Sequence, residues 1–201
     1  AYGNPKVLES EFRKLMEFEK GRYKVRRLSS PSDPILKTIM QHSKEDIAAG
    51  LQYVFEDIIV RFFKSQIKKY NRRNVAVAGG VFANVKLNQR ILEESGAQSI
   101  FVFPNMGDGG LPVGAGFAYL KKKPELLKTI YLGKMWSDEE VESAISAAGL
   151  KIDRRANIED DIAGLLAEGK VVGRFSGRME YGPRALGNRS ILARADDTSI
   201  N

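Results

Sequence analysis

Two short apolar runs, each followed at once by a glycine-rich turn, constrain the fold of this chain more than any other feature. Residues 75–78 (VAVA) precede Gly79-Gly80, and residues 99–103 (SIFVF) precede a glycine-bearing loop at residues 105–110. A helical pattern follows each turn. Strands that alternate with helices are typical of a parallel α/β sheet, which binds ligands at the carboxyl ends of its strands. The sequence therefore predicts an α/β fold with a ligand site at this edge.

A long amphipathic helix is expected before this unit. Ser43 can cap it, with Asp46 at the reciprocal position of a capping box. The apolar residues that recur at helical spacing and form its buried face are Ile47, Leu51, Val54, Phe55, Ile58, Phe62 and Ile67. A second helix is expected near residues 83–92, with Gly96 as its C-terminal stop.

A basic, proline-containing stretch at residues 121–124 predicts a domain boundary. Beyond it, Ser137 and Glu140 have the spacing of a second capping box, and their helix is expected to end near Gly149. The other elements expected here are a strand at residues 150–154, a helix capped by Asn157, a strand at residues 171–175 and a strand beginning at Ile191.

Composition narrows the class of protein. The chain has 201 residues with 43% hydrophobic and 28% charged content, as in ordinary globular proteins, and it contains no cysteine. No apolar run approaches the roughly 20 residues that span a bilayer, so we expect a cytoplasmic protein without a membrane partner. The net charge of +7 favours phosphorylated small molecules or nucleic acid as partners. The basic clusters lack regularly interleaved aromatic residues, which disfavours nucleic acid.

Residues 177–190 (GRMEYGPRALGNRS) lie between the last two expected strands and hold three arginines, Arg178, Arg184 and Arg189. Arginine grips phosphate through a planar fork of donors, and glycine lets backbone N–H groups approach an oxyanion. We interpret this segment, the arginine loop, as a site for a small, highly charged anion. A solvated basic turn, the alternative, would need neither the glycines nor the central Glu180.

Within this loop the side chains suggest different tasks. Arginines neutralise phosphoryl charge and can stabilise a transition state. Glu180 would repel phosphate, so we expect it to orient an arginine or to bind an amide or hydroxyl group. Asn188 and Ser190 add neutral groups suited to a small polar ligand.

The two glycine turns carry weaker signals. Gly79-Gly80 before a helix is typical of a phosphate or nucleotide contact, with Asn84 within reach, although a tight turn has the same appearance. The spacing matches neither a Walker A motif nor a dinucleotide fingerprint. Asp108, flanked by glycines, could meet a hard metal ion or could simply bond its own backbone in a turn.

The arginine loop resembles the signature of the O-carbamoyltransferases that modify nodulation factors and antibiotics. Residues 79–84 (GGVFAN) and 107–110 (GDGG) resemble two further motifs of that family, in the same order. The resemblance implies the second half of an actin-like (ASKHA, Kae1-like) domain at residues 1–122, a linker at residues 123–136 and the start of a YrdC-like α/β domain at residues 137–201.

The resemblance also implies an activity. Carbamoyl phosphate and ATP would form a carbamoyl-adenylate, and the carbamoyl group would pass to a hydroxyl group of a small-molecule acceptor. The roles carried over by position are nucleotide contacts for Gly79, Gly80, Asn84, Gly109 and Gly110, a divalent metal of the Fe or Mg type for Asp108, catalysis for Arg178, Arg184 and Arg189, and substrate binding for Glu180, Asn188 and Ser190.

The same family completes its metal site with a histidine pair, which the single histidine, His42, does not match. Ser176 stands where the family usually has glutamine before the arginine loop. We therefore expect an internal piece of a longer enzyme that is inactive alone. The alternatives are a relative of tRNA-modifying threonylcarbamoyladenosine enzymes and a non-catalytic nucleotide-binding module.

Overall fold

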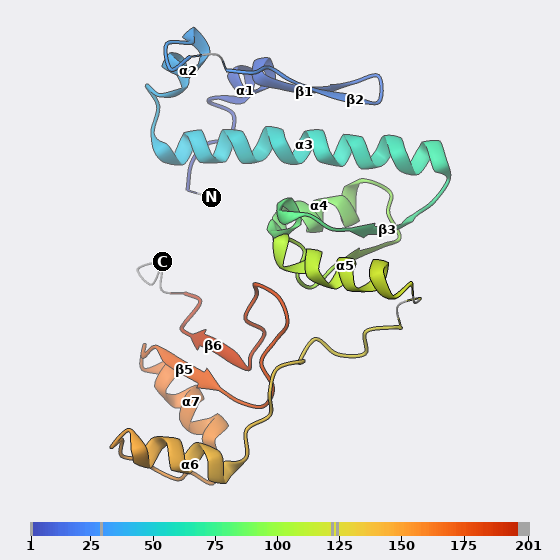
Figure 1. The fold of residues 1–201 in the computed structure, drawn as a ribbon. Coiled ribbons are helices and arrows are strands. Elements are labelled where there is room, and N and C mark those ends of the chain that lie inside the picture. The colour runs from blue at the N-terminus through green and yellow to red at the C-terminus, as the bar shows by residue number, and fades with distance from the viewer. Residues whose placement is uncertain (1, 29, 122, 124, 197–201) are drawn as a thin grey trace. The chain divides into compact units, whose positions relative to one another are not determined.

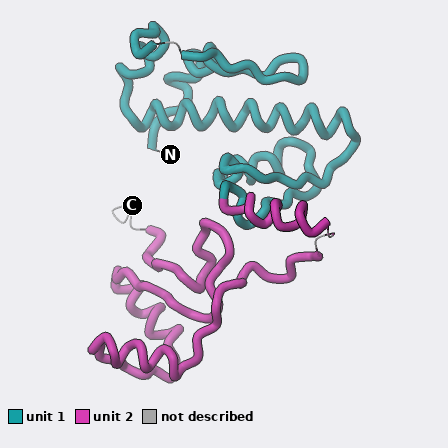
Figure 2. The backbone as a smooth tube through the Cα atoms, viewed as in Figure 1, with its two compact units in different colours: residues 1–108 teal, residues 109–201 magenta. Residues whose placement is uncertain are grey.

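A computed structural model describes residues 2–28, 30–121, 123 and 125–196 of the chain (Figure 1). The chain divides into two compact units, residues 1–108 and 109–201 (Figure 2). The boundary predicted at residues 121–124 falls partly outside the described residues, because Lys122 and Pro124 do, and so does the predicted domain end at residue 201. That division into domains stays a prediction.

The first unit begins with elements that the sequence pattern did not reveal. Helix α1 (Glu9–Leu15) runs into an antiparallel hairpin of β1 (Met16–Glu19) and β2 (Arg22–Val25). Helix α2 (Pro34–Ile39) follows. These elements have four to seven residues each, too few for an apolar period to stand out from chance.

The long helix is confirmed as α3 (Lys44–Tyr70), and the Ser43 hydroxyl accepts the N–H of Asp46 at 3.1 Å. The carboxylate of Asp46 accepts the backbone N–H of Asn4 at 2.7 Å, a partner that the capping-box pattern did not predict. This hydrogen bond lowers the pKa of Asp46 and ties the N-terminal segment to the start of the helix.

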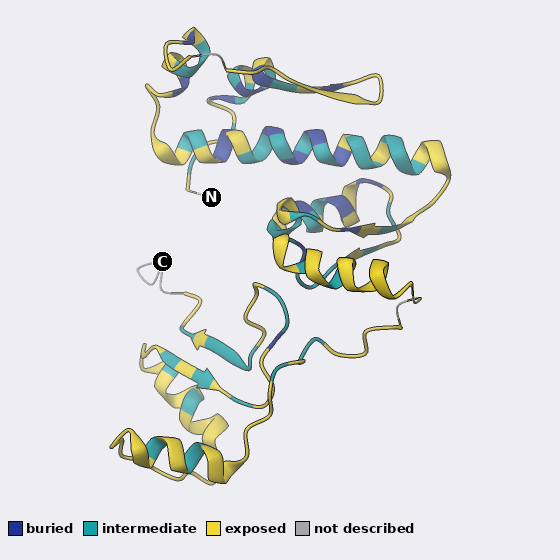
Figure 3. Ribbon diagram, in the orientation of Figure 1, coloured by how far each residue is buried: buried dark blue, intermediate teal, exposed yellow. Residues whose placement is uncertain are grey.

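Two groups of buried apolar side chains pack against α3, which lies between the α1–β1–β2 layer and the layer that contains α4 (Val85–Glu94) (Figures 1 and 3). The first group consists of Leu8, Phe12, Leu15, Phe18, Ile39, Val54 and Ile58. The second joins Val60 to Leu87 and Ile91. Leu51, expected on the buried face, is 42% exposed. The helix is therefore the central support of the first unit.

The predicted parallel unit is present at the end of this layer. Strand β3 (Asn74–Val77) pairs in parallel with β4 (Ser99–Val102), and α4 connects them. Gly96, at a φ of +86°, follows the last turn of α4 as the predicted stop. The carboxyl ends of β3 and β4 therefore share one edge.

The second unit contains α5 (Leu111–Leu120), α6 (Asp138–Ala147), α7 (Ile158–Ala167) and an antiparallel pair of β5 (Val172–Phe175) and β6 (Arg189–Leu192). The capping box of Ser137 and Glu140 is confirmed at the start of α6. Asn157 occupies the N-cap position of α7 without a side-chain bond to the backbone, because its amide donates to the carboxylate of Asp160.

The strand expected at residues 150–154 is wrong, because this segment is irregular and exposed. A strand needs a neighbour to satisfy its backbone groups, and no described residue pairs with this segment. The described parts form a mixed α/β fold, in agreement with the predicted class. Among the described helices, none has the length together with the apolar character that crossing a membrane requires.

Candidate functional site

Both glycine turns follow the carboxyl ends of parallel strands, as the sequence predicted, and the first turn contacts the start of the second. The backbone N–H of Gly79 donates to the carbonyl of Met106 at 2.6 Å. A Cβ atom added to Gly107 would lie 3.9 Å from the Cα of Gly80, so a side chain at position 107 would contact the first turn. Gly79 has a φ of +120°, which side-chain-bearing residues rarely adopt. A Cβ added to Gly80 meets nothing within 4 Å, so this turn leaves open space for a ligand to approach its backbone.

The glycine pair does not begin an α-helix, and here the sequence expectation needs correction. A 3₁₀ turn, η1 (Gly80–Ala83), comes first, and α4 begins at Val85 with Asn84 as its N-cap. The Asn84 Oδ1 accepts the N–H of Leu87 at 3.1 Å. The positive end of the helix dipole therefore lies at Asn84 and not at Gly79-Gly80.

Asn84 is also joined to α3, a contact that its sequence neighbourhood does not suggest. Its amide exchanges two hydrogen bonds with the amide of Gln52, at 3.0 and 3.1 Å. Gln52 donates to buried Glu56, which accepts a hydrogen bond from Arg90 at 2.9 Å. The hydrogen bond to Glu94, with a smaller contribution from the one to Glu56, raises the pKa of Arg90, although burial by itself would lower it. This polar network fixes α4 against α3, and it includes Asn84, the residue that directly follows η1.

Asp108 begins the short 3₁₀ turn η2 (Asp108–Gly110), which contains Gly109 and Gly110. A metal centre needs several ligands converging on one point. Within the described part of the chain, no three histidine, cysteine, aspartate or glutamate residues form a group that could hold a metal ion. The described residues thus supply Asp108 as one candidate ligand but do not by themselves fit a metal centre.

The arginine loop connects β5 to β6 in the second unit. Phe175 of β5 pairs with Arg189 of β6, so the loop leaves and re-enters the sheet at neighbouring positions. Arg189 and Ser190, expected in the loop, are the first residues of β6. The strand extends further back than the apolar pattern predicted because the ladder with β5 holds these residues.

Glu180 organises this loop from within. It is buried, at 7% exposure, and its Oε1 accepts backbone N–H groups of Leu186, Asn188 and Arg189 at 2.8, 2.7 and 3.3 Å. Burial alone would raise the pKa of Glu180, but the backbone hydrogen bonds outweigh it and lower the pKa to about 2. The carboxylate therefore positions Arg189 by a hydrogen bond to its backbone N–H and not by a contact with its guanidinium.

Arg189 makes the complementary set of contacts. Its guanidinium donates to the carbonyls of Ser176 and Asn188 at 2.8 Å each and of Gly177 at 3.1 Å. The guanidinium also lies over the ring of Phe175, at 3.5 Å from its centroid. The Glu180 carboxylate accepts backbone N–H groups of residues 186–189, and the Arg189 guanidinium donates to carbonyls of residues 176–177. These two oppositely charged groups hold the first limb of the loop (residues 176–181) to the second limb (residues 186–189).

The other predicted residues have these positions. Arg178 donates through Nη1 to the carbonyl of Gly133 at 2.9 Å, and the Asn188 amide donates to the carbonyl of Arg178 at 2.8 Å. The Ser190 hydroxyl accepts the N–H of Gly187 at 2.9 Å. Arg184 lies in the same loop. The loop brings Arg178, Glu180, Asn188, Arg189 and Ser190 together through hydrogen bonds to its own backbone, and their ligand-binding roles stay predictions.

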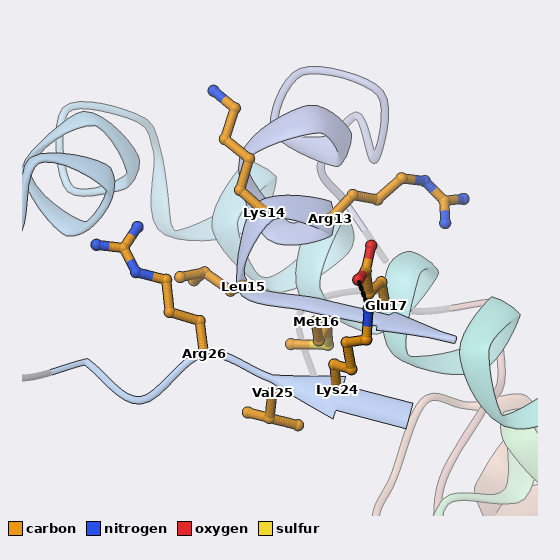
Figure 4. Close-up of a pocket in the computed structure, with 8 residues that line it drawn as sticks. All are labelled: Arg13, Lys14, Leu15, Met16, Glu17, Lys24, Val25 and Arg26. Atoms are coloured by element: carbon orange, nitrogen blue, oxygen red, sulfur yellow. Dashed lines mark hydrogen bonds and ion pairs between the residues drawn. The ribbon is translucent and has the colours of Figure 1, made fainter. Parts of the chain in front are cut away.

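A hollow of about 320 Å³ lies elsewhere, between the end of α1 and the β1–β2 hairpin of the first unit (Figure 4). Basic side chains line it, but their charges are balanced. Lys24 pairs with Glu17 at 3.2 Å, Arg13 with Asp57 at 2.9 Å and Arg26 with buried Asp33 at 2.8 Å. The hollow holds none of the predicted site residues, and its paired cations are not an anion site.

The chain is similar to two families of known proteins. The family described as carbamoyltransferase N-terminus matches residues 6–117, and that described as carbamoyltransferase C-terminus matches residues 163–201. An uncharacterized protein of Synechocystis sp. is 34% identical, over 85% of this chain and 29% of its own length.

Two relatives have names that describe a process. Nodulation protein NolNO of Sinorhizobium fredii is 32% identical, over 96% of this chain and 31% of its own length. Nodulation protein NolO of Bradyrhizobium diazoefficiens is 32% identical, over 96% of this chain and 38% of its own length. The chain spans about a third of the length of these curated relatives.

Proposed function

Since the chain belongs to the carbamoyltransferase family, we propose that the whole protein transfers a carbamoyl group from carbamoyl phosphate to a hydroxyl group of a small-molecule acceptor. Two similar proteins carry the name nodulation protein, and the acceptor of the small-molecule kind rests on the resemblance to carbamoyltransferases that modify nodulation factors and antibiotics. The acceptor pocket would rest on shape and a few polar contacts.

The proposal includes activation by ATP. Water would first hydrolyse carbamoyl phosphate to carbamate and inorganic phosphate. A carbamate oxygen would then attack the α-phosphorus of ATP and displace pyrophosphate, which gives a carbamoyl-adenylate. The acceptor hydroxyl would then attack the carbamoyl carbon, lose its proton and displace AMP, which is a better leaving group than hydroxide. Each step places charge on phosphoryl oxygens, and nearby guanidinium groups stabilise such charge.

The frame of the arginine loop is the observation that carries this proposal. Glu180 and Arg189 satisfy the backbone of the loop, and three arginines enter it within twelve residues, from Arg178 to Arg189. Because this backbone is already ordered, less conformational entropy is lost when the guanidinium groups bind a ligand. An anion as small as carbamoyl phosphate suits such a loop, and we assign catalysis to Arg178, Arg184 and Arg189.

The nucleotide is proposed to bind the two glycine turns. The open space over Gly80 supports an approach of phosphate to its backbone, whereas the N–H of Gly79 already donates to the carbonyl of Met106. Asn84, Gly109 and Gly110 complete the proposed nucleotide contacts. A divalent metal beside the nucleotide, of the Mg or Fe type, rests on the family resemblance alone, with Asp108 as its one candidate ligand here.

At the level of domains, we infer that residues 1–122 form the second half of an actin-like domain and residues 137–201 the start of a YrdC-like one. The parallel pair of β3 and β4 within the first of these ranges and the antiparallel pair of β5 and β6 within the second are compatible with this inference, although the two compact units meet at residues 108 and 109. We expect the 201-residue chain alone to form no carbamate ester, and product formed by the purified chain would contradict this.

Calorimetric titration of the chain with carbamoyl phosphate tests the proposal. We expect Arg184→Ala to weaken binding about tenfold or more, because a charge-assisted contact to phosphate is lost. Arg155→Ala is the matched control, since Arg155 lies in the same unit outside the loop and pairs with Asp153. Equal affinity of wild type and Arg184→Ala, or binding no tighter than that of inorganic phosphate, would overturn the assignment.

A further inference from the structure

We propose that residues 130–133 act as a positioning strap for the arginine loop, so that the affinity of the loop for its anion depends on this distant segment. The sequence predicts the same residues to be part of a linker between two domains. The claim that the strap affects anion affinity rests on the proposed function. The claim that the strap holds the loop rests on contacts within the second unit.

Backbone pairing joins the strap to one limb of the loop. The N–H of Tyr181 donates to the carbonyl of Ile130 at 2.7 Å, and the N–H of Gly133 donates to the carbonyl of Met179 at 3.0 Å. Between these bonds, Tyr131 and Glu180 form an antiparallel bridge. Three consecutive loop residues are therefore held in strand-like register by a segment about 50 positions away.

Side chains extend the contact to both limbs of the loop. The Tyr131 hydroxyl donates to the carbonyl of Leu186 at 3.0 Å, on the limb opposite Met179. The Arg178 guanidinium donates to the carbonyl of Gly133 at 2.9 Å. The strap thus sets the direction of one proposed phosphate-binding arginine, and it contacts the residues on either side of the buried carboxylate of Glu180.

Gly133 makes this close approach possible. A Cβ atom at position 133 would lie 2.7 Å from the Cβ and 2.9 Å from the backbone nitrogen of Met179, distances at which one of the two segments has to move. Gly133 is not among the glycines with positive φ, so alanine at this position does not incur the strain of a left-handed backbone. Gly133→Ala is therefore a steric wedge between strap and loop without added backbone strain.

The chain carries its own reporter beside the strap. Trp136 is the single tryptophan, and the Lys134 ammonium lies 3.7 Å from the centroid of its ring. Lys134 also pairs with Glu140 at the start of α6, at 2.9 Å. If strap and loop move together, a ligand in the loop changes the surroundings of this ring and hence its fluorescence.

The experiment compares wild type and Gly133→Ala by carbamoyl phosphate titration, Trp136 emission and amide hydrogen exchange. We expect Gly133→Ala to bind about tenfold more weakly or worse, because a displacement of about 1 Å is enough to misalign a charged contact. It should also lose the ligand-dependent change in Trp136 emission, and the amides of Leu186, Asn188 and Arg189 should exchange faster. Gly173→Ala is the control, because a Cβ there meets nothing within 4 Å.

Tyr131→Phe keeps the test decisive if Gly133→Ala does not fold. It removes only the hydroxyl that bonds Leu186, and we expect about fivefold weaker binding. Wild-type affinity together with wild-type exchange in the folded variants would overturn the strap. Failure of wild type to bind carbamoyl phosphate would instead overturn the proposed function, and the exchange rates would still decide whether residues 130–133 hold the loop.

Discussion

The described residues of the first unit include thirteen buried apolar side chains, among them Val54, Leu87 and Ile91 at 0% exposure. Between residues 109 and 196, the one buried residue that the structure describes is a glutamate, Glu180 (Figure 3). The first unit is thus stabilised by removing apolar surface from water, which is strong but carries no direction. The loop of the second unit is ordered by directed hydrogen bonds to charged groups.

The two regions therefore have different tasks: the apolar core supports the fold, and the arginine loop offers polar groups to a ligand. Apolar packing around α3 can hold the glycine turns in place, but it offers an anion no donors. The arginine loop presents donors, and its own backbone is satisfied by Glu180 and Arg189. A loop held in this way should respond to pH and to single polar substitutions, whereas the apolar core should respond mainly to changes in side-chain volume.

The largest expected effect is on the apolar core. Leu87 is fully buried between α3 and α4, so Leu87→Ala should lower the free energy of unfolding by about 2–5 kcal/mol through lost burial and a residual cavity. Leu92→Ala on the same helix, at 40% exposure, is the control. Urea unfolding of the two variants measures the difference. Equal losses would show that the contrast between buried and exposed positions does not hold here.

The next effect concerns acid sensitivity of the arginine loop. The pKa of Glu180 is lowered to about 2, below its ordinary value of 4.5, so the ionised carboxylate stabilises the folded loop above pH 4.5. This stabilisation should fade as the pH falls from 4.5 towards 2. Hydrogen exchange at Leu186 and Asn188, corrected for the intrinsic pH dependence, should therefore show declining protection over that window.

Glu180→Gln is the matched variant for this prediction. It keeps the shape and one acceptor oxygen but removes the charge, so protection of the same amides should be low at pH 7 already and should change little on acidification. Protection in the variant that equals wild type at pH 7 would contradict the role of the carboxylate. Amides of α4 in the first unit serve as the internal reference.

The smallest effect compares two helix N-termini of the second unit. Ser137 and Glu140 form a complete capping box, so Ser137→Ala should cost about 1 kcal/mol of stability. Asn157 makes no capping bond to the backbone of α7, so Asn157→Ala should cost much less. Thermal unfolding of both variants checks this. A larger loss for Asn157→Ala would mean that its bond to Asp160 stabilises α7 more than a cap does.

Local sequence patterns predicted the elements whose signals lie within a few residues. Ser43 and Ser137 marked the starts of α3 and α6, and the apolar runs marked β3, β4 and β5 within about one residue. Periodicity did not predict α1, β1, β2 or α2, which are too short to show it. It also produced a strand at residues 150–154 that has no partner among the described residues.

For the candidate site too, the sequence indicated which residues lie close together along the chain but not their contacts with distant segments. The sequence concentrated three arginines, Glu180, Asn188 and Ser190 in one segment, and it placed both glycine turns at strand ends. It did not indicate that Gln52 would hold Asn84, because 32 positions separate the two residues. Nor did it indicate that the predicted linker would pair with the arginine loop.

For this protein, the sequence alone determined which chemical groups are available and where the strongest local elements begin, because capping, turn and strand signals act over a few residues. Only the tertiary structure decided what each group contacts. Glu180 accepts three backbone N–H groups, Arg189 donates to three carbonyls, and Gly133 packs against Met179. The first two sets of contacts arise where the two limbs of the loop fold together, and the third where a distant segment meets the loop, because polar groups removed from water must find partners.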